Sequence, residues 1–363
     1  MSGRITLTDV AQHAGVSPAT ASLVLRGTGR LSDTTRQRVQ ASMEALGYVY
    51  HRGAASLRGT RSQTIGLIVS DISNVFTAEL SIGLESTLAE RGVVTLMASS
   101  LEDPDRQRLL LRSMLERQVD GILIIPVIDT DQRFVDQLTG IGVPAIIASR
   151  EPDDHDLSYV GIDNLKGGRL AAEHLITHDI TEFGYLGGHN EIGPRQGRYA
   201  AAVSVMAKHG VPITMDVTGQ PTGDLGLSVA RRALRDGGLP SGLICQNDQV
   251  AFGVYRALRE AGSDTGPEAI KVVSFDDVAE AALWEPPLTS IAASGRQVGI
   301  RCAEVLHRRI QDPDSPIERS LIMPSIVVRQ SCGCPPPQQT DGRSTTSTAA
   351  PRRATEAPSR TLA

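Results

Sequence analysis

Polar and aromatic side chains stand in five groups that each follow a short apolar run of the sequence. The groups are Asp71, Asn74, Phe76 and Thr77; Ser149 and Arg150; Arg198; Asn247 and Asp248; and Asp276 and Asp277. Arginine offers a fork of N–H donors and aspartate a charged acceptor, so together they can grip adjacent hydroxyl groups. Aromatic rings supply a stacking face for such a ligand. The pattern therefore predicts a binding site for a sugar or a sugar derivative.

Each of these assignments has a structural alternative. An Asp-Asp pair after a strand also caps helices, and Phe76 also suits a hydrophobic core. A nucleoside is the second choice of ligand, because a base-stacking pocket needs more flat surface than a chain with 3% aromatic residues offers.

The sequence lacks motifs for catalysis and for metals. No HExxH, Walker or GxSxG motif occurs, and residues 226–230 miss the last by their final residue. The eight histidines are scattered, without a spacing that would gather three around one metal. Cys332 and Cys334 are closer than a disulfide or a structural zinc pair needs and lack partners, whereas Cys245 and Cys302 suit buried positions. We expect no enzyme, no metal and no cofactor.

The apolar runs that position the polar side chains alternate with helical patterns, in two sets. The first set covers residues 65–69, 93–98, 121–125 and 144–148, and the second covers residues 182–186, 215–219, 242–245 and 272–275. Continuous apolar strands between helices indicate parallel sheets that helices cover on both faces. Two sets indicate two lobes, with a cleft at the carboxyl ends of the strands. The candidate site residues would meet in that cleft.

The chain begins with a different pattern, a pair of short helices around a glycine turn. Thr6 stands three residues before Asp9, a capping-box spacing that starts a helix, and Gly15 ends it. Ser17 and Pro18 start a second helix. Its inward positions are Ala21, Val24 and Leu25, and the positions that can approach a base edge are Pro18, Ala19, Thr20, Ser22 and Leu23. The pair predicts a helix-turn-helix.

A third helix and a concentration of positive charge complete this head. Ser32 caps the helix, Val39, Met43 and Leu46 face inward, and Gly47 ends it. Residues 1–62 hold eight arginines against three acidic residues, a net charge of +5, so the remainder of a chain with a net charge of −5 carries −10. A basic segment on an acidic protein is typical of a phosphate-binding surface, with a solvated basic surface as the alternative.

Five segments of the head carry a resemblance to a known family. They are Thr8-Asp9-Val10-Ala11, Ala14-Gly15-Val16-Ser17, Thr20-Ala21-Ser22, Thr35-Arg36 and Leu46-Gly47-Tyr48. With them the chain resembles the lactose-repressor (LacI/GalR) family over nearly its whole length. The resemblance implies an α/β fold in which an all-α helix-turn-helix head precedes a two-lobed sensor of the type I periplasmic-binding-protein kind. It also implies that the second helix enters the major groove, with Pro18, Ala19, Thr20 and Leu23 at base-contacting positions.

The same resemblance implies a hinge helix at residues 52–57 that becomes ordered on operator DNA. It also implies that Leu57 inserts into the minor groove. Tyr50 and His51 replace the family's usual proline and asparagine. Gly53 makes the hinge costlier to order by about 1 kcal/mol relative to alanine. The expected DNA-binding residues are Thr6, Ser17, Pro18, Ala19, Thr20, Ser22, Leu23, Arg26, Arg30, Arg52, Ala54 and Leu57.

In the sensor, the resemblance implies that Arg198, Asn247 and Asp276 line the effector site, with Phe76 or Thr77 as the contact from the first lobe. The expected effector-binding residues are Asn74, Phe76, Thr77, Ser149, Arg198, Pro221, Asn247, Asp276 and Trp284. Two departures from the family concern the effector. Pro221 stands where some sugar-binding relatives have an aromatic residue, and Ala201-Ala202 replaces their glycine-aromatic pair.

The expected domains follow from these patterns. They are the head at 1–49, the hinge at 50–62, an N-lobe of about 63–162 and 293–323, a C-lobe of about 163–292 and 324–334, and a tail at 335–363. The resemblance implies that the chain crosses between the lobes near Gly161, Ile291 and Met323. The tail is rich in proline, serine and threonine and is expected to be disordered.

We expect a sequence-specific transcriptional regulator, in the first instance a repressor, that a small ligand controls from the cleft. The chain shows no C-terminal leucine heptad, so the expected state is a homodimer on double-stranded operator DNA. It shows neither a signal-peptide pattern nor an apolar run of about 18 residues, which predicts a cytoplasmic protein without a membrane partner. The alternative is a solute-binding protein of sugar uptake without a DNA function, which would need an export signal and no basic head.

Overall fold

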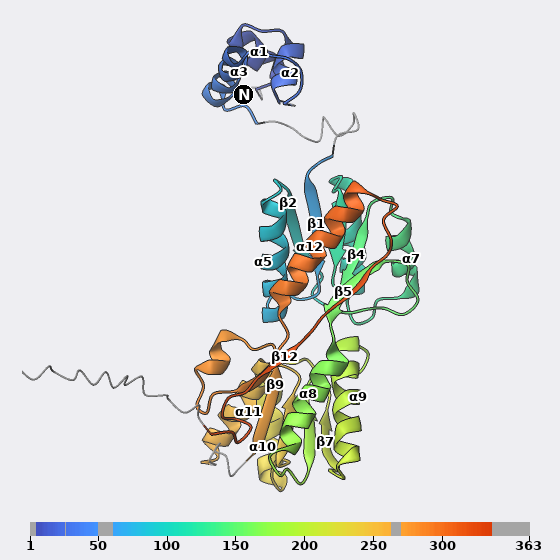
Figure 1. The fold of residues 1–363 in the computed structure, drawn as a ribbon, viewed down its shortest axis with the longest axis vertical. Helices are drawn as coiled ribbons and strands as arrows, with labels where there is room; N and C mark the ends of the chain where they lie inside the picture. The colour runs from blue at the N-terminus through green and yellow to red at the C-terminus, as the bar shows by residue number, and fades with distance from the viewer. Residues whose placement is uncertain (1–4, 26, 50–60, 263–269, 336–363) are drawn as a thin grey trace, which may run out of the picture.

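A computed structural model describes residues 5–25, 27–49, 61–262 and 270–335. It shows a small helical head and two α/β lobes (Figure 1). The expectations for Arg26, for the hinge residues Arg52, Gly53, Ala54 and Leu57, and for the tail beyond residue 335 lie outside the described residues. In the part of the chain that is described, no helix is both long enough and apolar enough to span a bilayer.

The head consists of α1 (Leu7–Ala14), α2 (Pro18–Leu25) and α3 (Asp33–Leu46), which confirms the three predicted helices. The Thr6 hydroxyl accepts from the Asp9 amide at 3.3 Å and the Asp9 carboxylate accepts from the Thr6 amide at 2.7 Å, so the predicted capping box is present. Gly15 and Gly47, both left-handed, end α1 and α3. The buried core of the head is Val10, Ala11, Ala14, Ala21, Val24 and Val39.

The N-lobe is built on a parallel six-stranded sheet with the order β11-β5-β4-β3-β1-β2. Its strands are β1 (Thr64–Val69), β2 (Val94–Ser99), β3 (Gly121–Ile124), β4 (Ala145–Ala148), β5 (Ser158–Ile162) and β11 (Arg319–Ile322). In this register Ile68 lies between Ala98 and Ile124. The parallel sheet confirms the prediction from the first set of apolar runs.

Helices cover both faces of this sheet (Figure 1). The pair α5 (Val75–Ala89) and α12 (Gly295–Gln311) covers one face, and α6 (Pro104–Glu116) and α7 (Gln132–Gly140) cover the other. Along β1, Ile65 and Leu67 pack under the first pair and Ile68 packs under the second. Burial on both faces explains why the strand is a continuous apolar run.

The C-lobe repeats this arrangement with the order β12-β10-β9-β8-β6-β7, and β12 alone runs antiparallel to its described neighbour. Its strands are β6 (Phe183–Leu186), β7 (Ile213–Val217), β8 (Gly242–Cys245), β9 (Lys271–Phe275), β10 (Thr289–Ala292) and β12 (Ser325–Val327). One face is covered by α8 (Asn164–Ile176) and α9 (Gly193–Lys208), and the other by α10 (Gly223–Asp236) and α11 (Asp248–Glu260). A short 3-10 turn, η1 (Ala279–Ala282), follows β9.

The sequence analysis missed the strands next to the passages between the lobes. The chain passes from one lobe to the other between β5 and α8, between β10 and α12, and between β11 and β12. The four strands next to these passages are β5, β10, β11 and β12. Each of them mixes serine, threonine or arginine with apolar residues, so none of them shows as an apolar run. Each lobe is therefore completed by segments that are distant in the sequence, as α5 and α12 show where they lie side by side (Figure 1).

One prediction about cysteines is confirmed and another is wrong. Cys245 and Cys302 are fully buried, as expected. Cys332 and Cys334, however, do have neighbours with ligand atoms, because the Cys334 sulfur lies 3.4 Å from Nε2 of His178 and 4.0 Å from Nε2 of His174. The prediction overlooked that His174 and His178, which are four residues apart, lie on the same side of the chain at the end of α8.

Candidate functional site

The outward side of α2 is the candidate nucleic-acid interface. Ser17, Pro18 and Ala19 at its start are exposed, and Thr20, Ser22 and Leu23 are half-buried. A recognition helix presents its N-terminal residues to base edges in this way. Thr6 has a structural role in addition, since its hydroxyl belongs to the capping box of α1.

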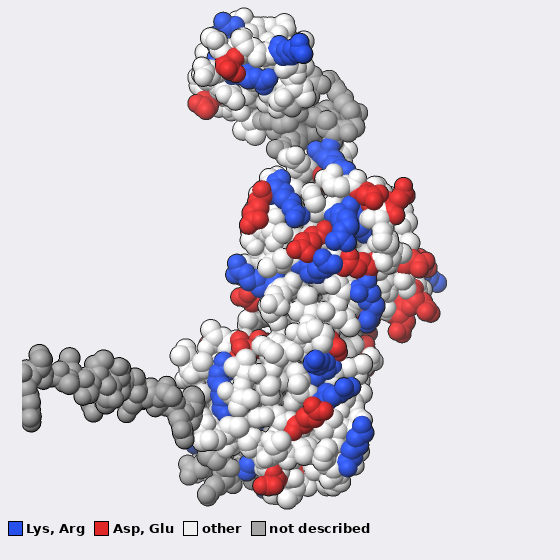
Figure 2. Space-filling view, viewed as in Figure 1, with Lys and Arg blue, Asp and Glu red and all other residues white. Residues whose placement is uncertain are grey.

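The described part of the head is not itself strongly basic. It holds Arg30, Arg36 and Arg38 against Asp9, Asp33 and Glu44, and both signs of charge are visible on it (Figure 2). The positive excess comes from arginines that flank or join the helices, namely Arg4, Arg26, Arg52, Arg58 and Arg61. The net positive charge of residues 1–62 therefore comes from the segments that flank or join the helices of the head.

A cavity at the carboxyl ends of the strands is lined by residues of both lobes. It encloses about 750 Å³, counting its open mouth, which is the size of a small-molecule site. Eight predicted effector residues line it: Asn74, Phe76, Thr77, Ser149, Arg198, Pro221, Asn247 and Asp276. Asp71 and Arg150, which the sequence pattern also singled out, line it as well.

Arg198 projects from α9 into this cavity and is only 6% exposed. Its Nε donates to Oδ1 of Asn164 at 2.9 Å and its Nη1 donates to the carbonyl oxygen of Gln246 at 2.8 Å. The guanidinium carbon lies 4.1 Å from the ring centroid of Phe275. Within the described residues no hydrogen bond uses Nη2, and both acceptors are neutral. The charge of Arg198 is thus available to a ligand.

The position of Arg198 depends on a close approach of α8 and α9. A Cβ at Gly168 would lie 2.1 Å from the carbonyl oxygen of Arg198, so glycine is required at this crossing. Asn164 stands at the start of the same helix, α8. One helix therefore supplies both the small residue and the amide oxygen that aim the guanidinium.

Asp276 follows β9 and has a φ of 101°, a conformation that residues other than glycine rarely adopt. Burial raises the pKa of its carboxyl, and the positive charge of Arg198 opposes that shift. In the described structure the two groups make no ion pair within 4.0 Å. A hydroxyl group between them can accept from the guanidinium and donate to the carboxylate.

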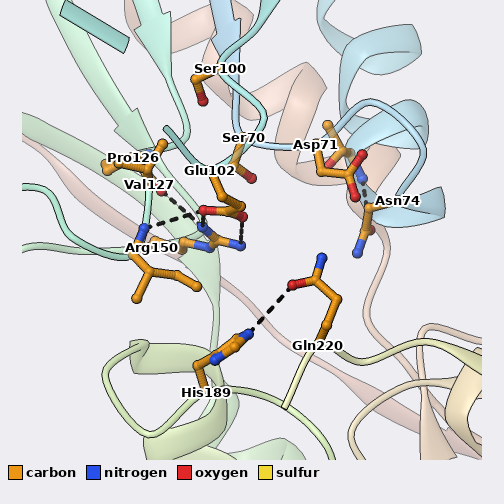
Figure 3. Close-up of polar contacts among 12 residues, drawn as sticks. Ser70, Asp71, Asn74, Ser100, Glu102, Pro126, Val127, Arg150, His189 and Gln220 are labelled. Carbon is orange, nitrogen blue, oxygen red and sulfur yellow. Dashed lines mark hydrogen bonds and ion pairs between the residues drawn. The ribbon is translucent and has the colours of Figure 1, made fainter. Parts of the chain in front are cut away.

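Asn247 holds the loop that forms the neighbouring part of the cavity. Its Oδ1 accepts from the Val250 amide at 3.0 Å, which caps α11, and its Nδ2 donates to the carbonyl oxygen of Pro221 at 3.0 Å. Beside Pro221, Oε1 of Gln220 lies 3.4 Å from Nε2 of His189 (Figure 3). We call His189, Arg198, Gln220, Pro221, Asn247 and Asp276 the C-lobe wall.

The opposite wall centres on an ion pair. Arg150, just after β4, donates from Nη1 and Nη2 to the two carboxylate oxygens of Glu102, each at 2.8 Å (Figure 3). Its Nη1 also donates to the carbonyl oxygen of Pro126 at 3.1 Å. Both side chains of the ion pair are 20% exposed. We call Asn74, Phe76, Thr77, Glu102, Ser149 and Arg150 the N-lobe wall.

Several residues of the N-lobe wall have a structural role besides lining the cavity. Oδ1 of Asn74 accepts from the Thr77 amide at 3.4 Å and caps α5. Phe76 packs partly against the N-lobe core, as the structural alternative expected, while it also lines the cavity. Ser149 has a φ of 64°, and its carbonyl oxygen accepts from the Tyr159 hydroxyl at 3.1 Å.

The structure places Trp284 outside the cavity, so the expectation that it lines the effector site is not met. Its indole stacks on Phe252, with ring centroids 4.9 Å apart and an interplanar angle of 11°. Tyr255 meets it edge-on at 5.9 Å. Both partners belong to α11, so the indole packs against the C-lobe core.

Asp248 has a structural role that the sequence analysis did not predict, and it is not that of a helix cap, because Asn247 caps α11. It starts α11 and is buried, and it accepts from the Ser290 hydroxyl at 2.8 Å, the Val278 amide at 2.8 Å and the Ser274 hydroxyl. Burial and the negative charge of Asp276 raise the pKa of Asp248 to about 7, although the three donors favour its charged form. This carboxyl fixes the loop that carries Asp276.

Among the cavity residues that the sequence analysis missed, four have charged, amide or imidazole side chains: Glu102, His189, Gln220 and Gln246. Each follows a predicted strand within a few residues, so the rule that found Arg150 and Asp276 would have found them too. The sequence analysis selected only some of the polar residues that follow each strand, so these four were left out.

Comparison with known proteins follows the division into head and sensor. Residues 6–50 match the model of bacterial regulatory proteins of the lacI family, and residues 172–332 match that of a periplasmic binding protein-like domain. The maltose regulon regulatory protein MalI of Escherichia coli K12 is 30% identical over 335 residues, which cover 90% of this chain and 98% of that relative.

Solved structures agree with the sequence relatives. A lac repressor dimer bound to operator and the anti-inducer ONPF matches with a TM-score of 0.83 at 25% identity, covering 91% of this chain and 99% of that one. A LacI family transcriptional regulator from Enterococcus faecium with bound ribose matches with a TM-score of 0.66 at 27% identity, covering 74% of this chain and 98% of that one.

A helix-turn-helix head followed by a two-lobed sensor with a cleft defines a ligand-controlled DNA-binding regulator. The chain belongs to the lacI family of bacterial regulatory proteins. A solute-binding protein without a DNA function does not fit, because the match to the whole-length relative includes the head.

Proposed function

We propose that this regulator is a repressor whose hold on operator DNA is controlled by a sugar or sugar derivative in the cleft. The observation that carries the ligand class is the placement of Arg198 and Asp276. A buried cation whose Nη2 makes no hydrogen bond within the described residues and a half-buried carboxylate line the same cavity without an ion pair between them. Neighbouring hydroxyl groups satisfy both, whereas an apolar ligand would leave two charges unpaired.

Relatives support this ligand class. The regulator from Enterococcus faecium has bound ribose, and MalI is named for a maltose regulon. The cavity also has the mixed character that a sugar needs. Phe76 offers an apolar face, and Asn74, Gln220 and Asn247 surround it with amides.

For DNA binding, we propose a homodimer that presents two heads to a pseudo-palindromic operator. The lac repressor relative is a dimer bound to operator. Each α2 would lie in the major groove with Ser17, Pro18 and Ala19 toward the bases, and the arginines that flank the helices would contact phosphates. Residues 50–62 would form the hinge that orders on DNA, so Arg52, Ala54 and Leu57 keep their predicted roles.

A ligand that bridges the two walls favours one angle between the lobes. Since both hinges continue into the N-lobes of the dimer, that angle decides whether the hinges order on the operator. Reciprocity requires that operator DNA change the ligand affinity by the same factor. The role needs no catalytic step, and a repressor works where the DNA is, in the cytoplasm.

Two linked measurements on the full chain test this proposal. A thermal-shift screen with free sugars identifies a ligand, because a compound at a hundred times its dissociation constant stabilises the native state by about 2.7 kcal/mol. Selection from a random double-stranded pool identifies the operator, and fluorescence anisotropy then measures its affinity with and without the sugar. We expect a change of at least about fivefold. If no selected DNA binds better than random DNA, the repressor assignment fails. If no sugar stabilises the protein, the ligand class fails.

A further inference from the structure

A cluster of four potential metal ligands lies in the C-lobe, away from the cleft. His174 is in the last turn of α8 and His178 follows that helix, while Cys332 and Cys334 stand in the segment after β12. All four ligand atoms lie within 4.8 Å of one another. Asn164, the residue of α8 that contacts Arg198, is at the other end of the helix, about 15 Å away at the rise of an α-helix.

The distances in this cluster are close to those of a tetrahedral zinc site. Zn–N distances of about 2.0–2.1 Å and Zn–S distances of about 2.3 Å give tetrahedron edges of about 3.3–3.8 Å. The Cys334 sulfur lies 3.4 Å from Nε2 of His178 and 4.0 Å from Nε2 of His174. Even the largest separation, at most 4.8 Å, exceeds an ideal edge by about one ångström, which a rotation of side chains can close.

The backbone between the cysteines brings both sulfurs to one side. Gly333 has a φ of 95°, which a residue with a side chain rarely adopts, and its amide donates to the carbonyl oxygen of Gln330 at 3.0 Å. This tight turn allows a pair separated by a single residue to chelate, which the usual longer spacing achieves without a left-handed residue. The prediction that Cys332 and Cys334 stand too close together for a zinc pair did not consider this turn.

A neighbouring hydroxyl supports the sulfur of Cys332. The Thr289 hydroxyl donates to that sulfur at 3.1 Å and itself accepts from the Arg329 amide at 2.9 Å, so its proton points at the sulfur. Cys332 is fully buried, and the other three ligand residues are half-buried. A donor held toward a buried sulfur is the outer-shell contact that stabilises thiolate ligands.

We propose that His174, His178, Cys332 and Cys334 bind one Zn²⁺ in a closed structural site. Two imidazoles and two thiolates form a borderline-soft, tetrahedral set, which suits zinc and leaves no open position for catalysis. Binding exchanges the two thiol protons for the metal and releases them to the solvent. The ion joins the end of α8 to a segment about 155 residues later, and so fixes the last described residues of the chain to the C-lobe.

Zinc binding is measured on the full chain, purified with reductant, stripped with a chelator and dialysed. Titration with Zn²⁺ against a chromogenic chelator gives stoichiometry and affinity, and Co²⁺ in place of zinc reports the geometry by absorption. We expect one Zn²⁺ per chain, a thiolate-to-cobalt charge-transfer band and strong tetrahedral d–d bands. His178→Gln and Cys334→Ser should each lose at least about tenfold in affinity.

Matched control variants separate the site from general effects. His209→Gln removes another histidine of the same lobe and Cys302→Ala removes a cysteine of the other lobe, and both should bind zinc like the wild type. Zn²⁺ should raise the melting temperature of the wild type but not that of His178→Gln, which covers the case of a variant that folds poorly. The proposal is overturned if the wild type binds zinc no more tightly than His178→Gln, or if its cobalt form lacks the thiolate band.

Discussion

The two walls of the cleft each carry an arginine, but they hold it in different ways. On the C-lobe wall, Arg198 is 6% exposed and donates to neutral oxygens, so its positive charge has no close partner among the described residues. On the N-lobe wall, Arg150 is 20% exposed and is neutralised by a two-pronged contact with Glu102. Because only one of the two arginines is neutralised within the protein, the two walls have different roles in ligand binding. The C-lobe wall is ready to anchor a ligand, whereas the N-lobe wall has to exchange internal contacts for ligand contacts.

The residues behind the walls follow the same division. The C-lobe wall rests on buried polar contacts, since Asp248 holds the Asp276 loop and Gly168 lets α8 reach Arg198. The N-lobe wall rests on helix capping by Asn74 and on an ion pair whose two side chains are 20% exposed. Four variants test this comparison.

The largest effect is expected from the buried carboxyl behind the C-lobe wall. The pKa of Asp248 is about 7 in the folded protein, above the ordinary value of 3.8, so the folded state binds the extra proton between these values. The free energy of unfolding should therefore fall as the pH rises from about 4 to about 7, by up to roughly 4 kcal/mol. Asp248→Asn should remove this slope in urea unfolding. The exposed Asp224→Asn should keep it, and equal slopes in both variants would contradict the role of Asp248.

Arg198→Ala should weaken ligand binding by about a hundredfold, or about 3 kcal/mol, because it removes the buried positive charge of the cavity and leaves the half-buried Asp276 without it. Isothermal titration with the sugar found by thermal shift measures this loss. Arg169→Ala removes an exposed arginine of the adjacent helix α8 and serves as the control. A loss of similar size in that control would mean that the effect is not specific to the cleft.

Gly168→Ala tests whether the anchor depends on helix spacing. The added methyl group meets the Arg198 carbonyl, so we expect a loss of about 2 kcal/mol in stability and a clear loss of ligand affinity. Gly193→Ala is the control, because no atom lies within 4 Å of a Cβ there. Equal behaviour of the two alanine variants in chemical unfolding and titration would remove Gly168 from the account.

The smallest effect is expected on the N-lobe wall. Replacing the ion pair by Arg150→Gln together with Glu102→Gln keeps hydrogen-bonding groups in place and removes both charges. Ligand affinity should change by no more than about 1 kcal/mol. If this double variant loses more ligand affinity than Arg198→Ala, the N-lobe wall and not the C-lobe wall is the one that anchors the ligand.

The sequence was informative where one local rule decides the outcome. Thr6, Gly15 and Ser32 predicted helix ends correctly because capping depends on neighbours in the chain. Apolar runs predicted the strands that are buried on both faces, but β10 and β12 are short, mix serine or threonine with apolar residues, and pair only through the fold. Asp276 was found because the carboxyl ends of parallel strands share an edge, whereas Arg198 lies within α9 and was implied by the family resemblance.

Other features could not be predicted, because they depend on contacts between residues that are distant in the sequence. Trp284 was assigned by residue type, and only the structure shows the aromatic partners on α11. The unused Nη2 of Arg198 depends on Asn164, which is 34 residues away. The histidine and cysteine cluster forms between segments 156 to 160 residues apart, so spacing within either pair could not reveal it.

The most direct test of the account measures operator affinity of the wild type and of Arg198→Ala, each with and without the sugar that stabilises the wild type. The account predicts that the sugar changes the operator affinity of the wild type by at least about fivefold. Arg198→Ala should bind the operator as tightly as the ligand-free wild type and should not respond at the same sugar concentration. A variant that responds like the wild type would show that the C-lobe wall does not anchor the effector.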